Sequence, residues 1–597
     1  MSESISNERL SKRNLWGYSM GGIGRDMAYQ LVNTYLLTFI TFTKGLSNTE
    51  FAMVGVIMVI CRIFDGCNDP FMGSLIEITR TKIGKFKPWI LAGVFTNVAV
   101  IIALFCVPLR GTSYLIFFAF GYLLWGMTYT MNDISYWGMM PSLTSNPGDR
   151  NNLTTLANIG AGVGAGLSVL AIPSLTQGNL AIASNASKSY AIVSIIVCIV
   201  FFVCQIMTVF VVKEKPLPKV RVDDGEKRSL KEMFRVIFKN DQLKPVMAAM
   251  LLYSIGSGIT MALASYWIYY RFAYQGLLVT LFTVISGIST VVIVFFPILC
   301  KKHSRRWISK LSMIMIIVGY LLMFIISLAT GADPKADKVG FNVGEVFIPV
   351  TFIFTGLSGA CAFFGQTLFY QVLTISVANT VEYNEYTTGT RDEGVIFACR
   401  PFTTKLGSAA VVGITTLVVL ALGLNPTNKA ISNADYEAGQ LAIQVEQLVK
   451  DETPNFDSLS KEEQTKLIEA KKKSIETENV AKIEYIIHTN EDTKVAKWQY
   501  QTMFAFMTLL PLVILLGSFA IYFKKYNINE ERYDEICAEI ARRKLAAEGN
   551  AEVVLDGADV NELENDLASS DAETPDEIFE QEAAADKISE APDEVEK

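Results

Sequence analysis

The chain has 597 residues, of which 51% are hydrophobic and only 19% are charged. Its mean hydropathy of +0.33 is too high for an ordinary soluble protein of this length, so the composition indicates a membrane protein. The formal net charge is −7, and the charged residues are concentrated in a few segments instead of being spread along the chain.

Long, nearly charge-free runs recur along the chain, such as "AIVSIIVCIVFFVCQIMTVFVV" at 191–212. Each run is long enough to cross a bilayer as a helix. The first follows a polar start without a small-residue cleavage site, so we expect a retained helix and not a signal peptide. Window reading predicts about twelve spans, near residues 15–42, 50–78, 88–108, 113–141, 153–175, 189–212, 245–271, 276–299, 307–330, 345–376, 394–422 and 499–523.

Basic residues cluster in alternate connections, including "TRTKIGKFKP" (79–88), the linker at 213–244 and "KKHSRR" (301–306). The positive-inside rule places these connections and both termini in the cytoplasm. The linker divides the spans into two six-helix halves, as in transporters built from repeats, whose site lies between the halves near the midplane. The expected order is a cytoplasmic N-terminus (1–14), six helices (15–212), the linker, helices seven to eleven (245–423), an insertion (424–498), helix twelve (499–524) and a tail (525–597).

Two polar segments lie outside the membrane scheme. The insertion at 424–498 is expected on the extracellular side as a small helical hairpin, whose second helix is opened by a capping box from Ser460 to Glu463. The cytoplasmic tail, acidic and Ala-rich from about residue 545 onward, is expected to be largely disordered.

Motifs of enzyme chemistry do not occur in the sequence. The two histidines, His303 and His488, both lie in connections, and there is no His/Cys metal cluster, phosphate-cradling loop or nucleophile elbow. We therefore expect neither an enzyme nor a bound cofactor.

The second predicted helix carries charges inside apolar sequence. Asp65, Asn68 and Asp69 stand at i, i+3 and i+4, so their side chains project from one face. An ionised side chain at a helix centre costs roughly 2.5–3.5 kcal/mol, so such residues mark a functional site by default. Two carboxylates and an amide oxygen suit a small cation such as sodium, and a proton could occupy the same carboxylates.

The fourth predicted helix repeats the pattern. Thr130, Asp133 and Trp137 place a hydroxyl, a carboxylate and an indole on neighbouring parts of one face. A sugar-like ligand needs hydrogen-bond partners for its polar edges and an aromatic ring for its apolar face. This face is therefore a candidate sugar site.

Further polar side chains come from the first and eleventh predicted helices. The first places Asp26, Gln30 and Asn33 along one face with Arg25 adjacent, and the eleventh carries two bases, Arg400 and Lys405. Acids of the first half thus have bases available in the second. The alternative reading is structural ion pairs, and for Arg62 alone we expect pairing with a neighbouring acid.

The motifs "GRDMAYQ", "RIFDGCNDPFMG", "TRTKIGKFKPWIL", "WGMTYTMNDISYW" and "TTKLGSA", in this order, closely resemble the glycoside-pentoside-hexuronide:cation symporter family. The resemblance covers residues 15–524 except the insertion. It implies an all-α membrane protein with the major facilitator fold, twelve transmembrane helices and alternating access. It assigns the cation site to Asp65, Asn68, Asp69 and Thr130, which would be metal ligands if sodium is the coupling ion. It assigns the sugar site to Asp26, Asp133 and Trp137, with Arg25 and Lys405 beside it.

The sequence departs from the family pattern in the sugar site. Asn158 stands where the family has an arginine in its fifth helix, and Arg400 stands where it has a neutral amide. The stretch 378–394 resembles the cytoplasmic motif after the tenth helix, with Asn379 in place of an aspartate. A cytoplasmic gate is expected from four charged residues, Arg150, Glu382, Glu385 and Arg391. The substrate-binding candidates are Arg25, Asp26, Gln30, Asn33, Asp133, Trp137, Asn158, Arg400 and Lys405.

The resulting hypothesis is a monomeric symporter of the bacterial cell membrane that imports a small sugar or glycoside with Na+ or H+, Li+ being a further candidate. Its expected partners are the sugar, the cation and the lipid bilayer, and no nucleic acid is expected. Two alternatives remain: an anionic sugar such as a hexuronide, suggested by Arg400 beside Lys405, and a non-transporting sensor that signals through the insertion or the tail.

Overall fold

The computed structural model describes residues 10–144, 146–213, 239–289, 292–330, 339–343, 346–390 and 392–547. The chain forms two compact units, a large one of Met1–Val381 with Asp392–Asn529 and a small one of Glu382–Arg391 with Glu530–Lys597. Most of the predicted linker lies outside the described residues, as does the tail beyond residue 547.

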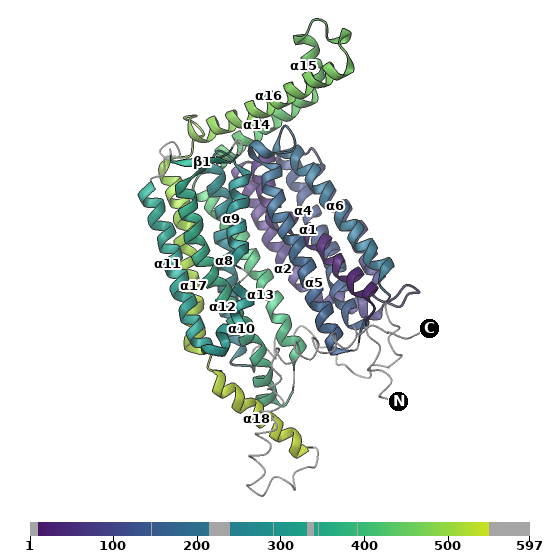
Figure 1. Cartoon of the computed structure of the whole chain (residues 1–597), viewed down its shortest axis with the longest axis vertical. Helices are drawn as coiled ribbons and strands as arrows, with labels where there is room; N and C mark the ends of the chain where they lie inside the picture. Colours follow the sequence, from purple (N-terminus) through teal and green to yellow (C-terminus); the bar gives the residue numbers. More distant parts are fainter. Residues whose placement is uncertain are drawn as a thin grey trace, which may run out of the picture. The chain divides into compact units, whose positions relative to one another are not determined.

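The N-terminal bundle consists, within the described residues, of six long helices drawn in purple to blue in Figure 1. The helices are α1 (Lys12–Thr43), α2 (Asn48–Ile78), α3 (Lys87–Cys106), α4 (Gly111–Met139), α5 (Pro147–Thr176) and α6 (Ala186–Val211), with short 3-10 turns η1 (Met140–Ser142) and η2 (Gly178–Leu180).

The C-terminal bundle follows in teal to yellow-green (Figure 1). Its helices are α8 (Leu243–Arg271), α9 (Gly276–Ile288), α10 (Val292–Lys302), α11 (Arg305–Thr330), α12 (Val350–Thr388), α13 (Glu393–Ala421) and α17 (Lys497–Lys525). Strands β1 (Gly340–Val343) and β2 (Val346–Pro349) pair antiparallel, with Phe341 opposite Ile348. Helix α18 (Glu530–Ala547) belongs to the small unit.

The insertion is helical, as predicted. It contains α14 (Asn425–Ile443), α15 (Val445–Glu452), η5 (Phe456–Ser458) and α16 (Lys461–His488). Helix α16 starts at the expected capping box, in which Ser460 and Glu463 bond each other's backbone amides. A small core that includes Val449, Phe456 and Ile475 holds the hairpin together. We call the helix ends next to this segment the insertion side.

Local sequence explains where several membrane helices begin. Ser47 and Glu50 form a reciprocal capping box at the start of α2, so two orphan backbone donors are satisfied. The side chain of Asn146 accepts hydrogen bonds from two amides at the start of α5, and Pro147 occupies its first position. Helix α12 ends where Gly389 adopts a φ of 73°, which other residues disfavour.

Among the predicted spans, the tenth has the wrong bounds. The tenth begins as strand β2 and continues as α12 to Thr388, because no Gly or Pro occurs between the predicted end at 376 and Gly389. Within the eighth predicted span, α9 ends at Ile288 and α10 begins at Val292, and residues 290 and 291 lie outside the described part of the chain. The tail opens with helix α18, whose charged sequence carries an Arg543–Glu539 ion pair one turn apart.

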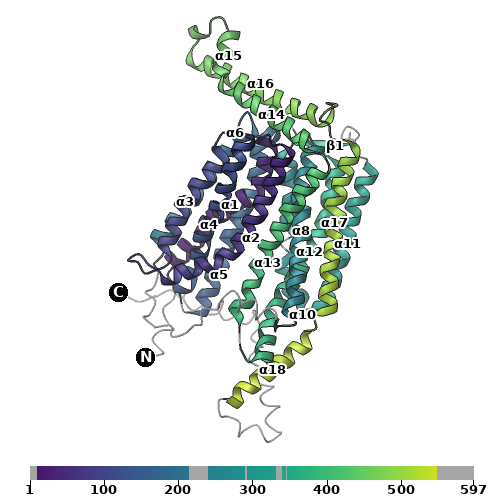
Figure 2. The ribbon, with the colours of Figure 1, turned by 180° about the vertical axis from the view of Figure 1, so that it is seen from behind.

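Within the described residues, nine helices are long and apolar enough to cross a membrane. Helices α1 and α2 have the length but carry the intramembrane charges, and α9 and α10 divide one predicted span between them. The two bundles meet where α2 packs against α13 and α5 packs against α9 (Figures 1 and 2). This is the interface at which the candidate site was expected.

Small residues let α1 and α5 approach closely. A Cβ atom at Gly164 would lie 2.0 Å from the carbonyl oxygen of Ile23, and one at Gly160 would lie 2.4 Å from that of Ser19. Glycines spaced four apart commonly form such contacts between membrane helices.

We expect Gly164→Ala to destabilise the N-terminal bundle by about 1–3 kcal/mol, because the added methyl group has no space against the α1 backbone. Thermal unfolding in detergent measures the effect. Gly162→Ala is the matched control on the same helix, since its added Cβ would meet no atom of another helix within 4 Å. Equal stability of the two variants would contradict the close approach of α1 and α5.

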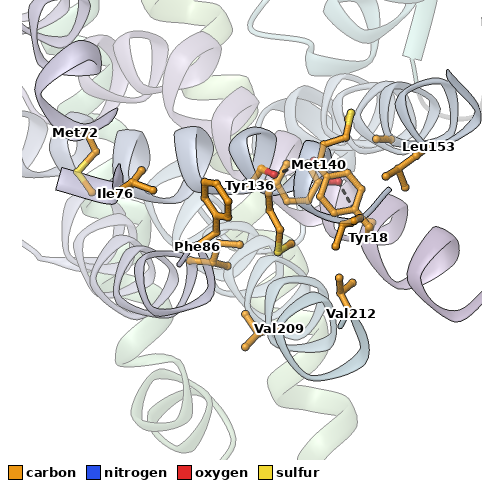
Figure 3. Close-up of a cluster of buried hydrophobic side chains, with 13 residues drawn as sticks. Tyr18, Met72, Ile76, Phe86, Tyr136, Met140, Leu153, Val209 and Val212 are labelled. Atoms are coloured by element: carbon orange, nitrogen blue, oxygen red, sulfur yellow. Dashed lines mark hydrogen bonds between the residues drawn. The ribbon is translucent and has the colours of Figure 1, made fainter. Parts of the chain in front are cut away.

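A buried apolar cluster includes Tyr18 of α1 and Tyr136 of α4 (Figure 3). The rings of Tyr18 and Tyr136 stack with centroids 4.4 Å apart, and each hydroxyl donates a 2.8 Å hydrogen bond to the other residue's carbonyl oxygen. Apolar side chains that include Phe86 and Val212 surround the pair. The cluster fixes the relative position of the two helices that carry Asp26 and Asp133.

Candidate functional site

Arg25 of α1 lies between two predicted sugar-site carboxylates. Its guanidinium is 2.6 Å from Asp26 Oδ2 and 3.0 Å from Asp133 Oδ1 of α4. The Arg25 side chain is 4% exposed, whereas that of Asp133 is 35% exposed. Asp133 is therefore accessible to a ligand, although it already has a cationic partner.

Trp137 and Tyr136 flank the same guanidinium. The Arg25 Cζ atom lies 4.7 Å from the centroid of Trp137 and 4.8 Å from that of Tyr136. A cation placed over an aromatic face is attracted by its quadrupole. The structure thus brings the predicted indole and carboxylate together, and the Arg25 guanidinium packs against one face of the indole.

The predicted cation residues of α2 and α4 also meet. Thr130 Oγ1 donates a 2.7 Å hydrogen bond to Asp65 Oδ1 and lies 3.5 Å from Asp69 Oδ1. The Lys405 ammonium of α13 is 3.0 Å from Asp65 Oδ2 and 2.6 Å from Asp69 Oδ2. These contacts join the two bundles through one base and two acids, because α2 and α13 belong to different halves.

The donor set fits a small hard cation. Two carboxylates and a hydroxyl supply oxygen ligands. The Lys405 ammonium, which is itself a small cation, contacts both carboxylates. No group of three or more His, Cys, Asp or Glu side chains arranged for a metal occurs among the described residues. Asn68 lies on the same helix and is half-buried.

Arg62 behaves differently from the expectation. Its guanidinium donates to Ser408 Oγ at 2.7 Å and to the carbonyl oxygen of Asn33 at 3.2 Å, so its hydrogen-bond partners within the described chain are neutral. The expected pairing with an acid was wrong, because the neighbouring Asp65 is engaged by Lys405 and Thr130. Arg62 instead forms a second link between α2 and α13.

A cavity of 470 Å³ lies between the bundles beside Arg62. Asn33, Arg62 and Ser408 line it and also line a smaller cavity that reaches Asp65 and Lys405. Hydroxyl groups dominate its polar wall, supplied by Thr34, Thr38, Tyr253, Ser254, Ser257, Ser265, Tyr266, Thr283, Tyr370, Thr404 and Thr415. Asp26, Asp133 and Trp137 are not among its lining residues, so the predicted sugar carboxylates and this cavity are distinct parts of the interior.

Several cavity residues were missed from the sequence. Ser254, Ser257, Met261 and Ser265 recur at helical spacing on α8, a pattern that marks one face, but isolated serines in an apolar helix read equally well as packing residues. Only the position of α8 opposite Asn33 makes this face a candidate site.

The remaining substrate candidates occupy different surroundings. Gln30 accepts a 2.8 Å hydrogen bond from Thr34, and Asn158 is exposed on α5. Arg400 Nη2 donates a 3.0 Å hydrogen bond to the Tyr370 hydroxyl oxygen, and the guanidinium lies 5.5 Å from that ring. Arg400 has no carboxylate partner in the described part of the chain.

The predicted cytoplasmic gate stays a prediction. Arg150 donates to the carbonyl oxygen of Thr144 at 3.4 Å. Glu382 and Glu385 fall in the small unit and Arg391 lies outside the described residues. Asn379, which replaces the family aspartate, is buried.

Comparisons with known proteins place these features in context. Residues 17–443 match the family model described as MFS/sugar transport protein. Similar curated proteins include the raffinose carrier protein of Pediococcus pentosaceus, 26% identical over 71% of this chain and 64% of that protein, and the lactose permease of Lactobacillus delbrueckii subsp. bulgaricus, 28% identical over 72% and 66%. The isoprimeverose transporter of Lactiplantibacillus pentosus is 25% identical over 68% and 80%. The chain thus spans about two thirds of the length of the first two relatives.

Proposed function

Because the chain belongs to the MFS/sugar transport protein family, we propose that this multi-pass membrane protein is a cation-coupled symporter that carries a small sugar or glycoside by alternating access. The observation that carries the proposal is the placement of Lys405 from one bundle between Asp65 and Asp69 of the other. The related raffinose carrier and lactose permease support a sugar as the substrate. The protein is proposed to act as a monomer in the bacterial cell membrane.

Charge explains how cation binding and bundle movement would be coupled. Asp65 and Asp69 together carry two negative charges and Lys405 supplies one positive charge, so the group lacks one cation for neutrality. A sodium ion, lithium ion or proton at the carboxylates compensates the remaining negative charge and weakens the attraction between the carboxylates and the Lys405 ammonium. The α2–α13 link then loosens, and the bundles can rearrange around the bound substrate.

The proposed orientation follows the basic connections. Those at 79–88 and 301–306 face the cytoplasm, so the insertion side is extracellular and both termini are cytoplasmic. Substrate and cation then enter from the insertion side.

Uptake into vesicles containing the purified protein tests the proposal. A panel of labelled neutral and acidic sugars is offered under an imposed Na+ or H+ gradient, and at least one sugar is expected to accumulate above its external concentration. Sugar accumulation that does not respond to either gradient would contradict the proposed cation coupling. Sugar binding without counterflow would identify a sensor instead of a transporter.

Arg400 favours a second candidate, symport of an anionic sugar. The buried and candidate charged residues of the two bundles named above comprise equal numbers of bases and acids, namely Arg25, Arg62, Arg400 and Lys405 against Asp26, Asp65, Asp69 and Asp133. A bound cation adds one positive charge, which an anionic substrate would balance. Arg400 is exposed, has no described carboxylate partner and is held in place by Tyr370, as a binding group for a substrate acid would be.

If the substrate is anionic, Arg400→Gln is expected to weaken its binding by about 10- to 150-fold, the equivalent of a hydrogen bond to a charged group. Binding of a neutral sugar should change little. Isothermal titration with both sugar classes measures the difference. Arg542→Gln, at an exposed arginine of α18, is the control. Equal losses of affinity for anionic and neutral sugars would show that Arg400 does not recognise the charge of the substrate.

A further inference from the structure

The insertion bridges the two bundles at the insertion side. It connects α13 to α17, so both of its ends belong to the C-terminal bundle. Its first helix nevertheless packs against α1 and α6 of the N-terminal bundle (Figures 1 and 2). A segment carried by one half of the molecule therefore rests on the other half.

Asp435 forms the central contact of this bridge. Its carboxylate accepts hydrogen bonds from the backbone amides of Ala186 at 2.6 Å and Ser187 at 3.1 Å, the first two residues of α6. Asn185 donates in return to the carbonyl oxygen of Asp435 at 3.0 Å. Amides at a helix start have no partner within the helix and carry the positive end of its dipole, so a carboxylate is well suited to them. Asp435 is only 2% exposed.

Arg110 forms a second contact with the same face of α14. Its Nη2 atom donates to the Ser432 carbonyl oxygen at 3.0 Å, to the Ser432 hydroxyl at 2.8 Å and to Asn433 Oδ1 at 3.1 Å. The guanidinium lies 4.5 Å from the ring of Tyr436. Arg110 precedes α4 and belongs to the N-terminal half. We call the four residues Ser432, Asn433, Asp435 and Tyr436 the α14 latch.

Nearer its start, α14 is also bonded to the C-terminal bundle. The Tyr270 hydroxyl of α8 donates a 2.6 Å hydrogen bond to Asn428 Oδ1. Asn428 and Asp435 are seven residues apart, which is about two turns of one helix. One continuous helix is thus bonded to α8 at one point and to the start of α6 at another, so the helix cannot follow both bundles if they move apart.

We propose that the α14 latch holds the extracellular side of the transporter closed and that Asp435 is a positioning residue of the transport cycle. The inference rests on the proposed function for the need to open this side. Entry of substrate from outside requires the extracellular ends of the bundles to separate, and the carboxylate of Asp435 must then leave the amides of α6. Direct contacts between the bundles, such as Gln177 with Tyr274 at 3.0 Å, break in the same movement.

The latch is built to be reversible. Burial raises the pKa of Asp435 to about 6, because loss of water outweighs the two amides and the nearby charges of Arg110 and Lys44. At neutral pH the carboxylate remains charged but is held at a desolvation cost, which is relieved when the latch opens into water. An apolar contact would offer no such release.

The distance between the bundles tests the latch directly. In a background without the native cysteines, spin labels are placed on two exposed lysine positions, Lys188→Cys on α6 and Lys497→Cys on α17. Double electron–electron resonance is recorded on the purified full chain without substrate. Asp435→Ala is expected to raise the ratio of open to closed molecules about tenfold, since it removes both charge-assisted hydrogen bonds. Asp435→Asn keeps one acceptor oxygen and is expected to have a smaller effect.

Glu437→Ala is the matched control, because Glu437 lies on the same helix and pairs with Lys482 inside the insertion. If Asp435→Ala does not fold, Arg110→Gln removes the second contact and should open the same side. Unchanged distances in the folded variants would overturn the latch. The readout needs no transported substrate, so this failure is distinct from a failure of the uptake assay, which would overturn the proposed function alone.

Discussion

Replacing Asp69 or Asp65 with cysteine is expected to abolish cation-dependent uptake while leaving the protein in the membrane. Each variant removes one of the two anionic ligands, and Thr130 supplies only a neutral oxygen in its place. The loss of one charged ligand is expected to lower cation affinity at least about tenfold. Lys405 keeps the other carboxylate, so no buried base is left without a partner and the fold should persist.

Sodium-dependent uptake and direct sodium titration of the purified variants measure this result. Asp457→Cys provides a control, because the Asp457 side chain is 89% exposed in the insertion and the variant removes the same charge. Gradient-driven uptake that stays at the wild-type level in both site variants would remove the cation-site assignment. Loss of folded protein would indicate instead that the acids act mainly as partners of Lys405.

Asp133→Asn is expected to weaken sugar binding by roughly 1.5–3 kcal/mol, the range for a hydrogen bond to a charged group, while the cation still binds. Asp133 is the more exposed of the two partners of Arg25, so it has accepting capacity left for a ligand. Arg25 retains its 2.6 Å contact with Asp26, and the variant is therefore expected to fold. A purely structural role predicts the opposite pattern, a lower yield with unchanged affinity.

Trp137→Ala separates the two roles further. If the indole stacks against a sugar ring, its removal should weaken binding, and sodium titration should remain unchanged. If it serves only Arg25, over whose guanidinium it lies at 4.7 Å, stability falls and sugar affinity does not. Binding measurements on purified Asp133→Asn and Trp137→Ala decide between these outcomes, and wild-type sugar affinity in both would sink the sugar-site assignment.

The sequence predicted the features that depend on residues close together in the chain. Apolar runs of span length identified the membrane helices, since the backbone of a lipid-exposed segment must satisfy its own hydrogen bonds. Helical spacing placed Asp65 and Asp69 on one face, and their cost in lipid marked them as functional. The Ser460–Glu463 capping box located the start of α16 within one residue.

Contacts between segments far apart in the chain were decided only by the tertiary structure. The sequence indicated that Asp69 needs a basic partner, and the packing of α2 against α13 brings Lys405 to it. Arg62 donates instead to Ser408 and to the carbonyl oxygen of Asn33. The hydroxyl-lined cavity depends on α8 facing α1, which no local pattern specifies. In the sequence, Asp435 resembles an ordinary polar residue of a surface helix, and only the structure shows its contact with the start of α6. Ion pairs and caps formed between distant segments depend on three-dimensional proximity, whereas a sequence reveals only which groups need a partner.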